Sequence, residues 1–169
     1  MKRLVILVIY VVVGLAATAQ EQTPKYEVFG GYSAFFPDVF DARQAIHGWN
    51  ASIGGNFNSW LGLKLDLSGH YRSFSGTRLM VHNYMLGPQF SYRAKHLTPF
   101  AHALFGGSNI SGSGGANGFA MALGGGVDWN LNRNFAIRVA QADYLRTHFG
   151  GEWQQDTRVS TGVVLRWGE

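Results

Sequence analysis

The chain has 169 residues, of which 46% are hydrophobic and 14% aromatic, and its length suits a single domain. It contains no cysteine, which excludes a disulfide framework and a lipid-anchored amino-terminal cysteine. The net charge of +4 is modest and no cluster of Lys and Arg concentrates it, so the charge pattern argues against nucleic acid as a partner.

The first nineteen residues have the pattern of an export signal. Lys2 and Arg3 precede an apolar run from Leu4 to Leu15, and Ala17-Thr18-Ala19 provides a small-residue cleavage site. A retained transmembrane helix is the alternative, but it needs about 20 apolar residues. The run is too short for that and ends in small residues. We therefore predict a cleavable signal peptide over residues 1–19, then a short periplasmic segment over 20–24.

The rest of the chain alternates apolar and polar residues, which is the period of a β-strand with one polar face. The clearest example sets Leu63 and Leu65 on one face against Lys64 and Asp66 on the other. Eight segments are predicted as strands: Lys25–Ala34, Gly48–Phe57, Leu61–Tyr71, Asn83–Tyr92, Pro99–Ser108, Gly118–Trp129, Phe135–Thr147 and Thr157–Trp167.

Two of these segments alternate less regularly. Both faces of Pro99–Ser108 are apolar or small, so the facing of His102 stays open. In Phe135–Thr147 the polar Asp143 falls on the same set of alternate positions as the apolar Ile137 and Val139. A one-residue bulge near Ala140 would turn Asp143 inward and Tyr144 outward.

The connections between the predicted strands alternate in length. Short turns are expected at 58–59, 93–97 and 130–134, and longer loops at 36–47, 72–82, 109–117 and 146–155. Outer-membrane barrels have short periplasmic turns and longer outer loops. The pattern therefore predicts that both termini lie in the periplasm.

Aromatic residues fall into two bands separated by aliphatic residues and glycine, as expected for interfacial girdles around an apolar belt. The band near the short turns comprises Tyr26, Phe57, Trp60, Tyr92, Phe100, Trp129, Phe135 and Trp167. The band near the long loops comprises Tyr32, Trp49, Tyr71, Tyr84, Phe105, Phe119 and Tyr144. We predict an all-β fold, an eight-stranded antiparallel up-and-down transmembrane β-barrel over residues 25–169. A soluble lipocalin- or streptavidin-like barrel is the alternative, and it would fill its lumen with these apolar residues.

Three motifs resemble those of small OmpA-like and OmpX-like outer-membrane β-barrel proteins, often labelled porin family: Val28–Tyr32, Gly87–Tyr92 and Thr98–Phe100. The final strand also resembles the carboxy-terminal signal read by the barrel assembly machinery, although two residues follow its aromatic residue. The residues that carry that signal are Ser160, Gly162, Leu165 and Trp167. The resemblance implies a location in the outer membrane, with its lipids, lipopolysaccharide and the assembly machinery as partners.

The polar faces of the predicted strands place eight charges in the lumen: Glu27, Asp66, Asp128, Asp143, Lys64, Arg138, Arg158 and Arg166. Four of each sign in a narrow lumen should pair, because an unpaired buried charge is costly. Eight strands leave an interior about wide enough for side chains alone. We therefore favour a salt-bridged plug over an ion path.

These observations favour a non-enzymatic outer-membrane protein with a structural or interaction role, in which long loops contact surface ligands. A narrow-pore channel is the first alternative. A lipid A-modifying enzyme is the second, with His82, His148 and Asp156 among its loop candidates, but no spacing sets these residues apart from ordinary loop residues. We predict no cofactor, and no metal site, because Asp38, Asp41 and His47 in the first predicted long loop lack an EF-hand spacing.

Overall fold

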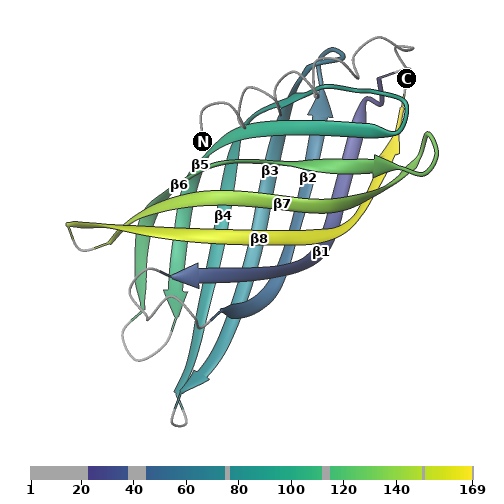
Figure 1. The fold of residues 1–169 in the computed structure, drawn as a ribbon. Helices are drawn as coiled ribbons and strands as arrows, with labels where there is room; N and C mark the ends of the chain where they lie inside the picture. Colours follow the sequence, from purple (N-terminus) through teal and green to yellow (C-terminus); the bar gives the residue numbers. More distant parts are fainter. Residues whose placement is uncertain (1–22, 38–44, 75–76, 112–114, 150, 169) are drawn as a thin grey trace, which may run out of the picture.

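The computed structural model describes residues 23–37, 45–74, 77–111, 115–149 and 151–168, so the predicted signal peptide lies outside the described residues. Eight strands form the fold, and each pairs antiparallel with its chain neighbours (Figure 1). They are β1 Tyr26–Pro37, β2 Ile46–Asn56, β3 Leu61–Phe74, β4 Thr77–Ser91, β5 Leu97–Ser111, β6 Ala116–Asn130, β7 Phe135–Phe149 and β8 Glu152–Trp167. Pairing of β1 with β8 closes the barrel, so the predicted eight-stranded antiparallel fold is confirmed.

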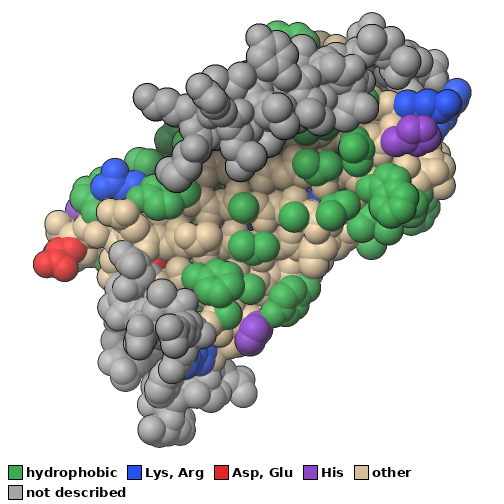
Figure 2. Space-filling view, in the orientation of Figure 1, with side chains coloured by type: hydrophobic (Ala, Val, Ile, Leu, Met, Phe, Trp, Pro, Cys, Tyr) green, Lys and Arg blue, Asp and Glu red, His purple; other side chains and the backbone are tan. Residues whose placement is uncertain are grey.

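The outside of the barrel is apolar and the inside is polar. Leu63, Leu65 and Leu67 on β3 point outward and are 38–42% exposed, whereas Lys64 and Asp66 between them are buried. Figure 2 shows hydrophobic side chains over the visible wall, with charged ones gathered toward its ends. This arrangement is the opposite of a soluble barrel and excludes the lipocalin-like alternative.

In the part of the chain that the structure describes, no helix is long and apolar enough to cross a membrane.

The strands are longer than predicted at the end opposite the short turns. β3 and β4 stay paired out to Phe74 and Thr77, and β7 and β8 out to Phe149 and Glu152. The predicted long loops at 72–82 and 146–155 are therefore wrong, because these residues mostly extend the two hairpins, and most of the predicted loop at 109–117 likewise belongs to β5 and β6. The reason is that backbone pairing continues beyond the apolar belt, where side-chain alternation no longer marks a strand.

A bulge in β7 explains why its apolar and polar residues change parity along the strand. Val127 pairs with Ala140 while Asp128 pairs with Arg138, so Val139 is left unpaired between them. Beyond the bulge Asp143 faces the lumen, as predicted for a bulge near Ala140.

The facing of β5 is settled by its burial pattern. His102 and Phe100 both point into the lumen, while Phe105 points outward. The prediction that Phe100 belongs to an aromatic girdle is therefore wrong. Side chains on both faces of β5 are apolar or small, so its sequence does not indicate which face contacts lipid.

The seam that closes the barrel depends on two facing glycines. Gly31 of β1 pairs with Gly162 of β8. A Cβ on Gly31 would lie 2.0 Å from the Thr161 carbonyl oxygen, and one on Gly162 would lie 2.3 Å from the Gly30 oxygen. The two strands can approach this closely only because neither residue has a side chain.

Candidate functional site

The lumen brings the eight predicted charged side chains together, and all of them are buried. They come from five strands and form two groups, one around Arg158 and one around Asp128. The five strands that supply them are β1, β3, β6, β7 and β8.

The first group surrounds Arg158, which is fully buried. Its Nη1 lies 2.8 Å from Asp66 Oδ1 and its Nη2 lies 2.6 Å from Asp143 Oδ2. Lys64 Nζ lies 3.6 Å from Asp66 Oδ2, and His102 Nε2 lies 2.9 Å from Asp143 Oδ1. Each carboxylate thus has Arg158 and one further basic partner.

The second group lies nearer the short turns and centres on Asp128. Arg138 holds this carboxylate with two nitrogens, Nε at 2.8 Å and Nη2 at 3.2 Å. Arg166 Nη2 lies 2.8 Å from Asp128, and its Nε lies 3.3 Å from Glu27. Arg93, from the turn after β4, completes the group by pairing with Glu27.

Gln141 joins the two groups. It accepts a hydrogen bond from Arg138 Nη1 at 2.8 Å and donates one to Asp143 Oδ2 at 2.8 Å. The Arg138 guanidinium lies over the rings of Phe29 and Phe100, at 4.3 and 4.2 Å from their centroids. The result is a continuous network that crosses the lumen.

Sequence reasoning missed Arg93 and Gln141. The bulge that turns Asp143 inward also turns Gln141 inward, because the two residues lie on the same parity beyond the bulge. Arg93 lies in a turn, where alternation gives no signal, and only the closed barrel shows that its side chain reaches Glu27.

An apolar layer lies between the network and the outer end of the lumen along β5 and β7. Along β7 the inward side chains change from Asp143 in the network to Leu145 and then Thr147, and along β5 from His102 to Leu104. The layer consists of Phe35, Ile46, Met85, Leu104, Ala120, Ala122 and Leu145. Beside Lys64 in the network the cavity volume is only about 10 Å³, room for about one water molecule. At the level of the network, the described part of the lumen is therefore filled rather than open.

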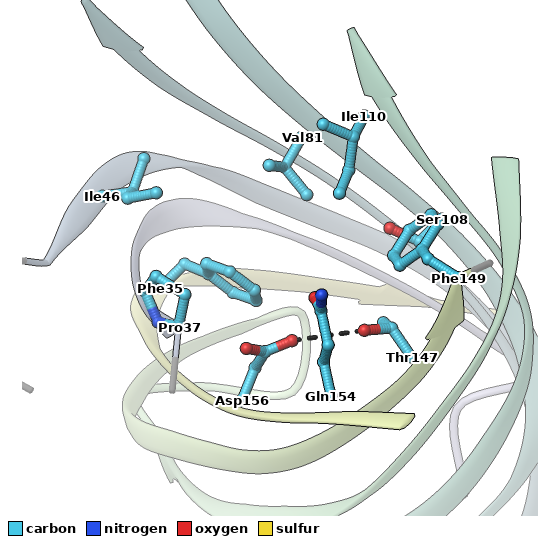
Figure 3. Close-up of a pocket in the computed structure, with 10 residues that line it drawn as sticks. All are labelled: Phe35, Pro37, Ile46, Val81, Ser108, Ile110, Thr147, Phe149, Gln154 and Asp156. Atoms are coloured by element: carbon cyan, nitrogen blue, oxygen red, sulfur yellow. Dashed lines mark hydrogen bonds between the residues drawn. The ribbon is translucent and has the colours of Figure 1, made fainter. Parts of the chain in front are cut away.

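Beyond this layer lies a cavity of about 200 Å³, here called the mouth pocket (Figure 3). It is lined by Phe35, Pro37, Ile46, Val81, Ser108, Ile110, Thr147, Phe149, Gln154 and Asp156. Its floor is the apolar layer, with which it shares Phe35 and Ile46. The buried Asp156 carboxylate accepts a hydrogen bond from Thr147 Oγ1 at 3.4 Å.

The loop residues considered for catalysis are not assembled into a catalytic group. Asp156 faces the mouth pocket, whereas His148 packs against Trp153 at a ring distance of 4.8 Å. His82 contacts Tyr71 Oη at 3.3 Å. Asp38 and Asp41 lie outside the described residues. Within the described ranges, no cluster of three or more His, Asp or Glu residues could hold a metal ion.

The aromatic residues predicted for the two girdles, Phe100 excepted, point outward. Within the band near the long loops Trp49 Nε1 donates to Tyr71 Oη at 3.2 Å, and near the end of the β7–β8 hairpin Arg146 lies over the Trp153 ring at 4.9 Å. Exposed fractions of 41–73% are found for Tyr26, Trp49, Phe57, Trp60, Tyr71, Tyr84, Tyr92, Phe119, Trp129, Phe135, Tyr144 and Trp167.

Comparison of the sequence with known protein families and with curated proteins finds no match. Solved structures do match. Neisserial surface protein A has a TM-score of 0.66 at 14% identity, covering 87% of this chain and 100% of its own. OprG from Pseudomonas aeruginosa has a TM-score of 0.60 at 12% identity, covering 88% and 98%. Ail, the attachment invasion locus protein of Yersinia pestis, has a TM-score of 0.56 at 17% identity, covering 85% and 100%. The chain therefore has the fold of small eight-stranded outer-membrane β-barrels.

Proposed function

We propose that this protein is a non-enzymatic integral protein of the outer membrane with a structural and interaction role. The observation that carries the proposal is the inside-out barrel, in which leucines face outward while ion pairs fill the lumen. Such a wall is stable only in lipid, since a large exposed apolar belt in water would associate or aggregate. The predicted signal peptide over residues 1–19 would export the chain, leaving both barrel termini in the periplasm.

The filled lumen supports a plug rather than a pore. Arg158, Asp66 and Asp143 are held by contacts of 2.6–2.8 Å. An ion that crossed the lumen would have to displace these buried pairs and then pass the apolar layer above them. Both steps carry large desolvation costs.

Outer-membrane lipids and lipopolysaccharide are the partners that the outer wall favours. Arg146 and Trp153 face outward near the hairpin ends of β7 and β8, where a guanidinium stacked on an indole suits an anionic headgroup. The hairpins beyond the belt would present contacts to surface ligands. Ail provides a precedent among similar folds, because one of its structures contains the heparin analogue sucrose octasulfate.

The barrel assembly machinery is the proposed partner during biogenesis. Ser160, Gly162, Leu165 and Trp167 of β8 would form the recognised signal. The Gly162 backbone meets β1 at the closing seam, so the same strand would be recognised and then used to close the barrel.

The proposal is tested first by gel migration. We expect the membrane-fraction protein to migrate differently in SDS with and without boiling, because a folded membrane barrel resists SDS. Purified protein in planar bilayers should then show no discrete conductance, in the wild type and in Arg138→Ala alike. Migration unaffected by boiling would contradict the barrel, and conductance steps altered by Arg138→Ala would favour the channel.

A further inference from the structure

The mouth pocket contains a buried hydroxyl that is available to a ligand. Ser108 lines the pocket and is 1% exposed, yet within the described residues its Oγ has no hydrogen-bond partner. A buried polar group without a partner is unfavourable, and a bound molecule that supplies the missing hydrogen bond would remove that cost. Ser108 therefore marks one point at which an occupant would be held.

The walls around this hydroxyl are mainly apolar. Phe35, Ile46, Val81, Ile110 and Phe149 surround the cavity from five different strands (Figure 3). The cavity of about 200 Å³ is somewhat larger than an engineered apolar cavity of about 150 Å³ that binds benzene. The space and its lining suit one small ring or short chain.

The polar side of the pocket is small, so the apolar walls restrict the charge of the occupant. Asp156 and Thr147 lie together there, joined by a hydrogen bond, with Gln154 beside them. The mainly apolar walls would penalise any charged group that they strip of water. The pocket therefore selects an uncharged molecule.

We propose that the mouth pocket binds a small uncharged apolar molecule with a single hydroxyl or carbonyl group, which hydrogen-bonds to Ser108. This site goes beyond the structural role proposed above, and its failure would leave that role standing. The class includes monocyclic aromatic alcohols and ketones of similar size.

The test uses the full-length mature barrel in lipid nanodiscs and three probes that share one ring. 2-Phenylethanol is neutral and has a hydroxyl, ethylbenzene lacks the hydroxyl, and phenylacetate is anionic. Binding is followed by saturable shifts of the Val81 and Ile110 methyl resonances at known free probe concentrations. We expect 2-phenylethanol to bind more tightly than ethylbenzene, with phenylacetate weakest.

Two substitutions locate the site. Ser108→Ala should weaken 2-phenylethanol binding about fivefold, the value of one ordinary hydrogen bond, and leave ethylbenzene unchanged. Val81→Trp should abolish binding of both by filling the cavity, with binding then followed at Ile110 alone. Val159→Trp on the outward face of β8 is the matched control and should bind normally. If Val81→Trp does not give the heat-modifiable folded form, Ile110→Phe serves as the smaller filler, followed at Val81.

Three results would overturn the inference. Equal affinity for phenylacetate would show that the apolar walls do not select against charge. Unchanged binding in the filled variant would place the probe in lipid rather than in the pocket. An unchanged affinity of Ser108→Ala for 2-phenylethanol would show that the hydroxyl makes no contact.

Discussion

Replacing Arg158 with Met tests whether the ion-pair network holds the barrel together. Arg158 is fully buried and its guanidinium contacts two carboxylates, at 2.8 Å for Asp66 and 2.6 Å for Asp143. Methionine occupies a similar volume without the charge. The substitution therefore leaves two buried carboxylates short of their main partner.

The expected cost follows from what remains around each carboxylate. Removing one partner of a buried ion pair costs about 3–5 kcal/mol, because the other charge stays buried without compensation. Here Asp66 keeps Lys64 at 3.6 Å, and Asp143 keeps His102 at 2.9 Å. We therefore expect Arg158→Met to lower the free energy of unfolding by about 3–4 kcal/mol, in the lower half of that range.

Urea unfolding in lipid vesicles, followed by tryptophan fluorescence, measures this change directly. Adding Asp143→Asn to Arg158→Met should restore part of the loss, with a coupling energy of about 1–3 kcal/mol. Val159→Ala, one residue away and facing the lipid, removes two methylene equivalents and should cost about 1–2 kcal/mol, well below the loss for Arg158→Met. A decrease of less than about 1 kcal/mol in the free energy of unfolding of Arg158→Met would refute a buried network of paired charges that excludes water, and so would simple additivity in the double variant.

Three further substitutions test other parts of the barrel. Leu65→Arg puts a charge on the lipid-facing wall and should destabilise the barrel by about 2–4 kcal/mol in vesicle unfolding, whereas insensitivity would argue against a lipid belt. Gly31→Ala should lower the free energy of unfolding by about 1–3 kcal/mol, because its Cβ would force β1 away from β8. Gly30→Ala is the control and should be nearly neutral, because its Cβ would meet open space. Equal effects of the two substitutions would contradict the tight seam. Arg138→Lys keeps the positive charge but loses the two hydrogen bonds from the guanidinium to Asp128 and the stacking of the guanidinium on Phe29 and Phe100. It should cost about 2 kcal/mol, and a change below about 0.5 kcal/mol would show that charge alone matters.

The sequence by itself determined the class of fold and the face that each regular strand presents. Alternation over Leu63, Lys64, Leu65 and Asp66 is a local property, because successive side chains of a strand point to opposite faces whatever the strand pairs with. Because charged residues occupy one parity and leucines the other, the sequence also indicates which face meets lipid and which face lines the lumen. The eight-stranded transmembrane barrel could be predicted from this information.

Where residues no longer alternate between apolar and polar, only the tertiary structure determines the facing of side chains and the extent of strands. The facing of Phe100 and His102 on β5, and the continuation of the hairpins past the belt, depend on which residues lie across the sheet. Arg93 joins the network from a turn, where no periodicity exists. The mouth pocket depends most on closure, since Ser108 and Asp156 belong to β5 and β8 and meet one cavity only after β1 pairs with β8. Ion pairs and cavities arise from contacts between distant segments, and a strand's own pattern fixes a direction but not a neighbour.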